Sequence, residues 1–298
     1  MLTFHQLDVF IAVADHMSVR RAAEELVVSQ PAVSSSLAAL QREVGVALVA
    51  RDGRGIELTD AGRTMLAYAR RLRGLVDETL DAVRSVDGDT ARPIRLGATS
   101  TVASHVLTPM LADLRDLRPE LDFTLRVEKL ADLWRLLDQR DIDLAFGTRP
   151  PVTSAFTSVA TRPAEFVLVA RPGVVWAGRL GEATWLLREE GSTTRMVVEE
   201  VMARLDLSPR YLEIGSDEAV LRSAEAGLGL ALLPLDDVAG ALRSRTLVTV
   251  HTTATPVSRP WHAVVRADEP PTKPVQAFID DLTSLDDSFR PSEVARPH

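Results

Sequence analysis

The sequence predicts an α/β protein built from an N-terminal winged helix-turn-helix, a long linking helix and a C-terminal pair of doubly wound α/β lobes. Three observations favour this fold class. Two short helices with a tight turn between them occupy residues 18–48, a proline-free helical pattern covers residues 60–86, and strands alternate with helices from residue 94 onwards. A chain of 298 residues is long enough for a hydrophobic core in each part.

Composition excludes several classes of protein. The 46% hydrophobic and 26% charged residues are ordinary for a globular chain, and the absence of cysteine excludes disulfides, thiolate metal sites and thiol redox switches. The net charge of −8 argues against a surface that binds polyanions everywhere. The first residues lack a signal-peptide pattern and no apolar run approaches the ~20 residues of a membrane span, so we expect a cytoplasmic protein without membrane contact.

The first two helices support the turn that follows them. Residues 4–15 place Leu7 and Phe10 on one apolar face, which predicts a helix that packs behind the motif. Ser18 is a suitable N-cap for the next helix, SVRRAAEEL, whose small Ala22 and Ala23 allow close approach of another helix.

The third helix, from Ser29 to about residue 42, has a packed back and a short polar front. Ser29 can cap it, and Pro31 is tolerated in its first turn. Val33, Leu37 and Leu40 form the apolar stripe. Such a helix suits a DNA major groove, where hydroxyl and amide groups meet base edges. On the helix, the residues we expect at DNA are Ser29, Gln30, Pro31, Ser34, Ser35 and Ser36.

A two-stranded wing is predicted over residues 47–59, with Gly53 and Gly55 at its turn. Arginine and acidic residues are nearly balanced over residues 1–73, so bulk charge gives no support for DNA binding. We therefore expect local phosphate contacts from Arg51 and Arg54 at the wing tip.

The long helix that Thr59 caps carries apolar residues at alternating spacings of four and three. These heptad residues are Met65, Ala69, Leu72, Val76, Thr79, Val83 and Val86. The pattern favours a dimer seam, and the alternative is a helix that lies on its own globular domain. Residues 88–93 then break the helix and form a linker. The predicted domains are residues 1–58, 59–88 and 93–298.

Beyond the linker, the alternating strands and helices extend over too many residues for one sheet, so we expect two lobes. Lobe I covers about residues 93–161 and 267–285, and lobe II covers about residues 162–266. The final helix occupies residues 274–285, and residues 286–298 are expected to form a frayed tail.

Several weak patterns carry no function. The six histidines show no metal-ligand spacing, and Gly227 and Gly229 follow a helix and precede a strand, the reverse of a dinucleotide-binding order. No nucleophile elbow or catalytic carboxylate pair occurs. We therefore expect no metal, no cofactor and no enzymatic activity.

The N-terminal motifs resemble those of the LysR-type transcriptional regulators. The matching stretches are QLDVFIAVADHMSVRRAAEELVVSQPAVSSSLAALQREVG and ARDGRGIELTDAG. Two positions depart from the family pattern: Val49 stands where phenylalanine is usual, and Gln41 stands where glutamate is usual. Both departures are interpreted as changes of packing or capping.

The resemblance implies a winged helix-turn-helix, a dimerising linker helix and an effector domain shaped like type 2 periplasmic binding proteins. Such proteins assemble as homodimers or homotetramers, bind dyad-containing promoter DNA, act with RNA polymerase and respond to a small molecule between the lobes. It implies two crossovers, near residues 161–163 and 265–268. The alternatives are a DNA-binding regulator without a ligand and, with the first 87 residues unexplained, a solute-binding protein or an enzyme.

Hydroxyl-rich stretches follow strands and open helices at the expected cleft. Helix starts offer free N–H groups and a positive dipole end, which suits a small anion. The alternatives are that the hydroxyls are only N-caps and that Lys129 is only solvated. The stretch LREEGSTTR also resembles the branch of the family that regulates sulfur assimilation or carbon fixation. The expected effector residues are Thr99, Ser100, Thr101, Lys129, Ser192, Thr193, Thr194, Arg195 and Ser216.

Overall fold

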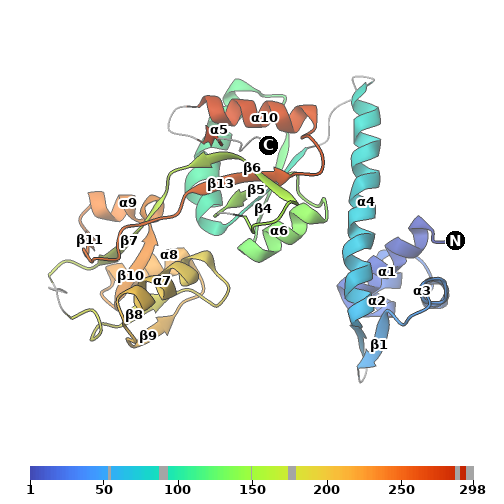
Figure 1. Ribbon diagram of the computed structural model, residues 1–298, viewed down its shortest axis with the longest axis horizontal. Helices are drawn as coiled ribbons and strands as arrows, with labels where there is room; N and C mark the ends of the chain where they lie inside the picture. Colours follow the sequence, from blue (N-terminus) through green and yellow to red (C-terminus); the bar gives the residue numbers. More distant parts are fainter. Residues whose placement is uncertain (53–54, 87–92, 149, 174–178, 286–288, 293–298) are drawn as a thin grey trace. The chain divides into compact units, whose positions relative to one another are not determined.

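The computed structural model describes residues 1–52, 55–86, 93–148, 150–173, 179–285 and 289–292. It divides into two compact units, Met1–Ala91 with Asp138–Asp141, and Arg92–Leu137 with Ile142–His298. Figure 1 gives the order of the elements along the chain. No helix in the described ranges is long and apolar enough to cross a membrane.

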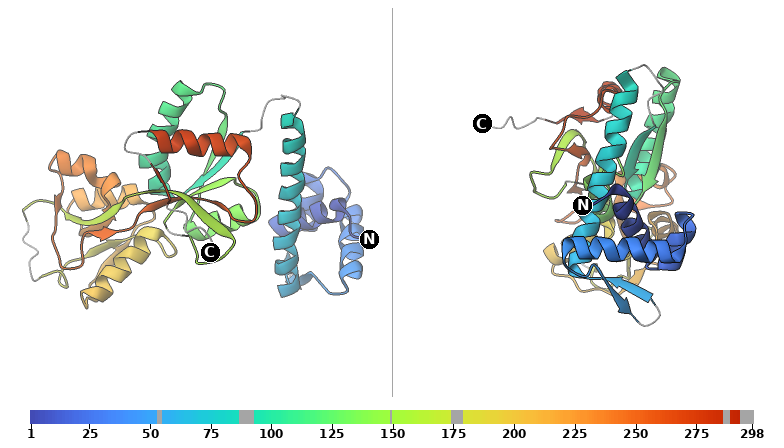
Figure 2. Two further views of the ribbon diagram at one scale, coloured as in Figure 1. Left: turned by 45° about the horizontal axis from the view of Figure 1, so that its top comes forward. Right: turned by 90° about the vertical axis from the view of Figure 1, so that its right-hand side faces the viewer.

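The N-terminal unit is a three-helix motif with a wing and a long helix. Its elements are α1 Phe4–His16, α2 Val19–Glu25, α3 Gln30–Val44, β1 Val49–Asp52, β2 Gly55–Leu58 and α4 Asp60–Val86. Side chains of Thr3, Ser18 and Ser29 cap the first three helices, as serine and threonine commonly do. Figure 2 shows β1 and β2 as a hairpin beside the start of α4.

Gln41 ties α3 to the wing. Its side-chain oxygen accepts hydrogen bonds from the backbone N–H of Leu48 at 2.8 Å and of Val49 at 3.3 Å. An amide does this without the charge that a glutamate would carry. At the other end of the wing, a Cβ on Gly62 would lie 1.9 Å from the Leu48 carbonyl oxygen, so this close approach requires glycine.

The heptad residues of α4 lie in two different environments. Ala69 is fully buried and Met65 packs against the same core as α1 and α3, so the first turns lie on their own globular unit. Further along, Leu72 and Val83 are 39% and 63% exposed. The alternative interpretation therefore holds for the first two heptad residues, and an uncovered apolar surface remains on the later turns.

Lobe I is a six-stranded sheet in the order β14-β6-β13-β5-β3-β4. Its strands are β3 Ile94–Ala98, β4 Phe123–Val127, β5 Leu144–Gly147, β6 Phe156–Arg162, β13 Trp261–Arg266 and β14 Arg290–Pro291. Its helices are the π-helix η1 Val102–Leu107, α5 Thr108–Leu117, α6 Leu130–Asp138 and α10 Lys273–Ser284. Side chains of α6 pack on one sheet face, and those of η1, α5 and α10 pack on the other.

Lobe II is a second six-stranded sheet. Its strands are β7 Glu165–Ala170, β8 Trp185–Leu187, β9 Tyr211–Glu213, β10 Leu230–Pro234, β11 Val248–Thr249 and β12 Val257–Ser258. Its helices are α7 Thr193–Arg204, α8 Asp217–Glu225 and α9 Leu235–Arg243. Along β10, Leu230 and Leu232 face α7, whereas Ala231 and Leu233 face α8 and α9. This alternation explains why strands buried on both faces are apolar throughout.

Both sheets are mixed rather than wholly parallel. In lobe I, β3 is parallel to β4 and β5, whereas β13 is antiparallel to β5 and β6. In lobe II, β8 is parallel to β9 and β10, and β7 is antiparallel to β10. The strands next to the crossovers between the lobes, β6, β7, β12 and β13, all pair in antiparallel fashion.

The second crossover differs from the prediction. The chain passes from β6 to β7 between Arg162 and Glu165, and it returns between Ser258 and Trp261 rather than at residues 265–268. All of β13 pairs within the sheet of lobe I. Its apolar pattern would suit either sheet, so the sequence alone did not place the boundary.

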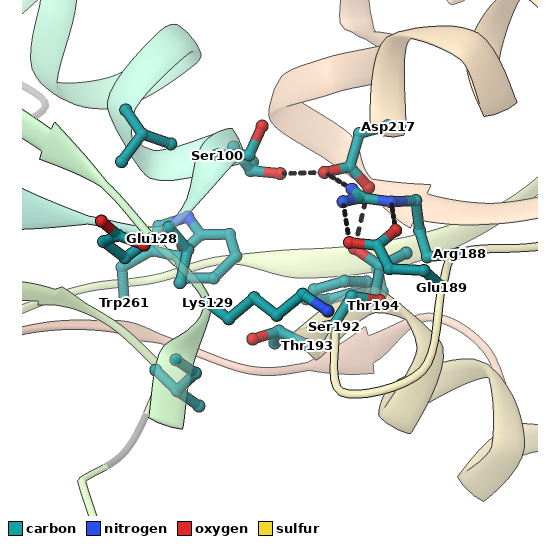
Figure 3. A pocket seen from close by; sticks show the side chains of 15 residues that line it. Ser100, Glu128, Lys129, Arg188, Glu189, Ser192, Thr193, Thr194, Asp217 and Trp261 are labelled. Carbon is teal, nitrogen blue, oxygen red and sulfur yellow. Dashed lines mark hydrogen bonds and ion pairs between the residues drawn. The ribbon is translucent and has the colours of Figure 1, made fainter. Parts of the chain in front are cut away.

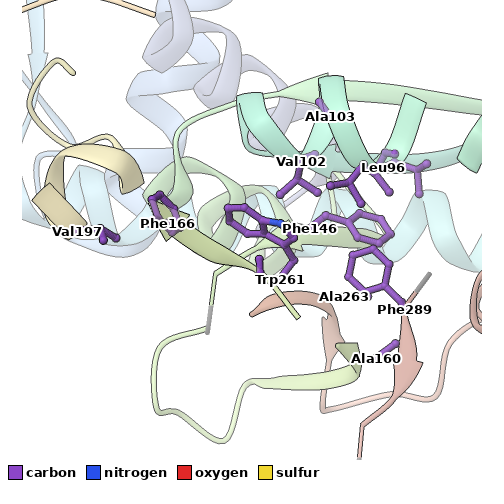
Figure 4. Packing of buried hydrophobic residues seen from close by; sticks show 14 of the residues in the cluster. Leu96, Val102, Ala103, Phe146, Ala160, Phe166, Val197, Trp261, Ala263 and Phe289 are labelled. Carbon is purple, nitrogen blue, oxygen red and sulfur yellow. The ribbon is translucent and has the colours of Figure 1, made fainter. Parts of the chain in front are cut away.

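The expected frayed tail is also wrong for residues 289–292. Phe289 is 1% exposed and its ring lies edge-on to Phe146, with ring centres 5.4 Å apart. Figure 4 shows both rings inside the main hydrophobic cluster. The buried Phe289 ring packs in the core directly before Arg290 and Pro291, which pair with β6.

Candidate functional site

A cavity of about 250 Å³ lies between the two lobes. Its walls combine hydroxyl, charged and aromatic side chains, as Figure 3 shows. The lining residues are Thr99, Ser100, Thr101, Val127, Glu128, Lys129, Leu130, Phe166, Arg188, Glu189, Ser192, Thr193, Thr194, Asp217 and Trp261.

The lobe I wall comes from the ends of two parallel strands. Thr99, Ser100 and Thr101 follow β3 at the start of a helical segment that continues as η1. Lys129 follows β4, and its Nζ donates to the backbone oxygen of Glu190 at 3.1 Å. The Oγ1 atom of Thr99 is buried without a hydrogen-bond partner. This wall therefore offers donors that the protein itself uses little.

The start of α7 supplies hydroxyls from lobe II. Ser192 is its N-cap and accepts a hydrogen bond from the backbone N–H of Arg195 at 3.1 Å. Thr193 also has a buried Oγ1 without a partner, whereas Thr194 Oγ1 donates to Asp217 Oδ1 at 3.0 Å. One of the three hydroxyls is thus committed to a carboxylate, and one lacks any partner.

Arg188 is the charged centre of the lobe II wall. Its guanidinium meets Glu189 in a two-point contact, with Nε to Oε2 at 2.8 Å and Nη2 to Oε1 at 2.9 Å, and its Nη1 pairs with Asp217. Burial lowers the pKa of Arg188, but the hydrogen bonds with the two carboxylates outweigh burial and raise it overall. The Arg188 hydrogen bonds hold the pKa of Glu189 below its usual value. Both shifts favour the charged forms of Arg188 and Glu189.

Hydrogen bonds join the lobes beside the cavity. Thr101 Oγ1, from lobe I, donates to Asp237 Oδ2 at 3.1 Å and lies 3.5 Å from Asp217 Oδ2. The Arg162 guanidinium meets both carboxylate oxygens of Asp236 at 3.0 Å. These carboxylates belong to α8 and α9 of lobe II, so the contacts fasten one lobe to the other.

Asp237 is a buried carboxyl at this junction. Its side chain is 3% exposed, and its Oδ1 has no hydrogen-bond partner, with His105 Nε2 at 3.5 Å. Burial, followed by the charge of Asp217, raises the pKa of Asp237 to about 8, although the Thr101 hydrogen bond opposes the rise. At neutral pH the protonated form of Asp237 therefore predominates.

Two aromatic residues close the cavity on its apolar side. Phe166 is the second residue of β7, just after the first crossover, and Trp261 is the first residue of β13, just after the second. Their rings meet edge to face with centres 5.9 Å apart, and Trp261 Nε1 donates to Asp236 Oδ2 at 3.2 Å. The crossovers thus supply both the link between the lobes and part of the cavity wall.

Seven of the nine residues predicted for the effector line the cavity, namely Thr99, Ser100, Thr101, Lys129, Ser192, Thr193 and Thr194. Arg195 does not. Its guanidinium is held by Glu199 at 2.5 Å and by the Arg188 backbone oxygen at 3.0 Å, and it lies over the Tyr211 ring. Ser216 caps α8 but is absent from the lining.

The sequence reasoning overlooked Arg188, Asp217 and the two aromatic residues as cavity residues. Arg188 directly follows a strand whose three residues are buried, and a charge at that position points to the open end of a sheet. Arg195, in contrast, is the third residue of α7, where a side chain extends along the helix surface. This positional difference was available in the sequence and would have favoured Arg188.

On the N-terminal unit, most predicted DNA contacts are exposed. Ser29, Gln30, Pro31, Ser34 and Ser35 are accessible on α3, and Arg51 is accessible on β1. Ser36 differs from these residues, because it is half-buried and its Oγ is buried without a hydrogen-bond partner. Arg54 lies outside the described residues. No group of three or more potential metal ligands occurs in the described parts of the chain.

Two family models match the chain. One, described as the LysR substrate binding domain, matches residues 87–286, and the other, the bacterial regulatory helix-turn-helix protein of the lysR family, matches residues 4–63. The RuBisCO operon transcriptional regulator of Allochromatium vinosum is 32% identical, and the alignment covers 100% of this chain and 98% of that protein.

Solved structures share the fold. A full-length OxyR variant from Pseudomonas aeruginosa has a TM-score of 0.70 at 20% identity, covering 100% of this chain and 99% of that one. The regulatory domain of Synechocystis CcmR in complex with 2-PG has a TM-score of 0.58 at 22% identity, covering 63% of this chain and 94% of that one.

Proposed function

The chain belongs to the LysR family of bacterial transcriptional regulators, and we propose that it binds a dyad-containing promoter site and responds to a small anion held between its C-terminal lobes. The Allochromatium vinosum relative is named as a transcriptional regulator, in agreement with the expectation that this chain is not an enzyme. A regulator of transcription acts where promoter DNA and RNA polymerase are, so we also propose a contact with RNA polymerase and a cytoplasmic location.

The observation that carries the effector proposal is the pair of buried threonine hydroxyls in the cavity. Thr99 Oγ1 and Thr193 Oγ1 come from opposite lobes, and neither has a partner. An unsatisfied buried hydroxyl costs about 1–3 kcal/mol, so a ligand that accepts hydrogen bonds from both would recover this cost. Lys129 adds a positive charge at the same place, and the effector is therefore proposed to be anionic.

Calorimetry on the full-length protein tests the effector proposal, with inorganic phosphate, sulfate and 2-PG as probes. Thr99→Val and Thr193→Val should leave folding stability unchanged or slightly improved, because each hydroxyl has no partner within the protein. For whichever probe the wild type binds, each variant should have an affinity about three- to tenfold lower. Unchanged affinity in both variants would place the effector elsewhere.

On the DNA side, we propose that Gln30, Ser34 and Ser35 contact bases and that Arg51 contacts phosphate. Arg51→Ala should weaken binding to all DNA sequences alike and reduce the salt slope by about one. Gln30→Ala should instead change the sequence preference. Fluorescence anisotropy on operator and scrambled duplexes distinguishes the two roles, and Arg222→Ala, an exposed arginine of lobe II, is the control.

For assembly, we propose that α4 forms a dimer seam and that dimers pair into tetramers. Tyr68, Leu72, Leu75, Leu80 and Val83 are each at least 39% exposed, an unusual density of apolar side chains on one helix. Leu75→Glu should shift the sedimentation coefficient toward the monomer. An unchanged oligomer would assign assembly to another surface.

A further inference from the structure

The charges around the cavity do not match an anion as they stand. Lys129 and Arg188 are its two cationic side chains, whereas Glu128, Glu189 and Asp217 are three anionic ones. An effector anion would therefore enter a cavity that already contains more carboxylates than cations. Either the effector uses only the lobe I donors, or one of the internal carboxylates gives way.

The two carboxylates on Arg188 are held very differently. Asp217 is 8% exposed and also accepts from Thr194 Oγ1 at 3.0 Å, so it is fixed by several contacts. The side chain of Glu189 is 26% exposed, and its carboxylate meets the Arg188 guanidinium, a backbone N–H of its own residue and the charge of Lys129. Figure 3 shows Glu189 on the loop before α7, at the cavity. Glu189 is therefore the partner that can leave, because water can solvate it once it does.

The carboxylate of Glu189 also contacts Arg188 with the geometry that a bound anion would adopt. Its two oxygens meet Nε and Nη2 side by side at 2.8 and 2.9 Å, which is the two-point geometry that carboxylates and phosphates adopt on arginine. We propose that Glu189 is an internal anion that occupies Arg188 in the effector-free protein, and that the effector's oxyanion displaces it. This inference rests on the proposed function and adds to it the exchange that sets effector affinity and selectivity.

Exchange has a consequence for selectivity. An incoming group must replace both hydrogen bonds of the Glu189 carboxylate, so an oxyanion with two adjacent oxygens can compete and a halide cannot. Phosphate and sulfate should bind, whereas chloride at the same concentration should not. The two sources of an oxyanion, carboxylate and phosphate, are separated by comparing acetate with inorganic phosphate.

The test is calorimetry on the full-length protein with inorganic phosphate as the probe. Glu189→Gln should bind phosphate about tenfold more tightly than the wild type, a change equivalent to about 1.4 kcal/mol. Glu190→Gln is the matched control, because it removes the same charge one residue further on, from an exposed side chain outside the cavity lining. The control should change the affinity less than twofold.

A second variant separates occupancy from charge. Glu189→Asp keeps the negative charge but shortens the side chain, so the two-point contact with Arg188 is lost, and phosphate affinity should still rise about threefold. It also keeps the proposal testable if Glu189→Gln does not fold. Equal affinity in the wild type and in both Glu189 variants would overturn the proposal and make the contact purely structural.

Failure of the proposed function gives a different result. If phosphate, sulfate and 2-PG fail to bind the wild type and both Glu189 variants, the anion-effector proposal is wrong. Arg188→Lys keeps the positive charge but lacks the two-point geometry of the guanidinium. Suppose that the wild type binds phosphate, that Arg188→Lys lowers the phosphate affinity at least fivefold, and that Glu189→Gln does not raise it. In that case only the displacement proposal is wrong.

Discussion

The two walls of the cavity differ in how many of their polar and charged groups already have partners within the protein. On lobe I, Thr99 has no partner for its hydroxyl and Lys129 gives one hydrogen bond to a backbone oxygen. On lobe II, Arg188 is paired with Glu189 and Asp217. The first wall offers donors at no internal cost, and the second offers a cation only after an internal contact is broken. The contrast concerns the two cations, since an unpartnered hydroxyl lies on each wall, Thr99 on lobe I and Thr193 on lobe II.

The largest expected effect on stability comes from the ion pairs of the lobe II wall. Arg188→Gln leaves Asp217 and Glu189 without their counter-charge, and breaking a buried ion pair on one side typically costs about 3–5 kcal/mol. Urea denaturation of the full-length protein measures the change. The control is Arg222→Gln, whose fully exposed contacts with acidic neighbours are screened by water, so this variant should unfold at nearly the same urea concentration as the wild type. Similar losses in the two variants would remove the contrast between the walls.

The next effect depends on pH. The pKa of Asp237 is about 8 in the folded protein, above its ordinary value, because of burial and then the charge of Asp217. Its stabilising contribution is thus complete at acidic pH and is lost as pH rises toward 8, by at most about 1.4 kcal/mol per unit. Asp237→Asn mimics the protonated form, so its advantage over the wild type should grow from pH 5 to pH 8.

Thermal melts of both proteins across this range check the prediction. The nearby charged groups are His105, Asp217, Asp236 and Arg188, and all remain in the variant. Parallel stability profiles for the wild type and Asp237→Asn would show that another group titrates.

Thr101→Val should have an intermediate effect. The substitution preserves shape but removes the hydroxyl that donates to Asp237 at 3.1 Å, so a loss of about 1–3 kcal/mol is expected. Thr101→Ser keeps the hydroxyl and should recover most of the stability. Chemical denaturation at pH 7 gives both values. A valine variant as stable as the serine variant would show that this contact between the lobes contributes little.

The smallest effect on stability is expected from Lys129 on the lobe I wall. Lys129→Met should change the free energy of unfolding by less than about 0.5 kcal/mol, because its one hydrogen bond is exposed. Phosphate affinity should nevertheless fall about three- to tenfold. Lys273→Met, at the only other lysine of the sequence, is the control and should change neither quantity. Loss of stability without loss of affinity would reverse the roles assigned to the walls.

Much of the fold could be predicted because its elements carry local signals. Ser18, Ser29 and Ser192 each start a helix in the sequence and cap one in the structure. The second crossover could not be placed, because β13 has an apolar pattern that fits either sheet and only pairing with β5 and β6 decides between them.

The candidate site could be predicted in part for a related reason. Hydroxyls such as Thr99 and Thr193 were found because a helix start fixes where they lie. Arg195 was chosen over Arg188 because it follows the hydroxyls directly, although the position of Arg188 at the end of a buried strand would have favoured Arg188. Trp261 reaches the cavity only through long-range strand pairing, which no local pattern reports.

The main hydrophobic cluster does not stop at the boundary between the lobes. Phe166 and Trp261 belong to the same cluster as Leu96 of lobe I and Leu232 of lobe II. Wide separation of the lobes would bring this shared core into water, at about 25 cal/mol for each Å² of apolar surface. We therefore expect a wide opening of the lobes to be energetically costly, and an effector to act through small relative displacements of the two lobes.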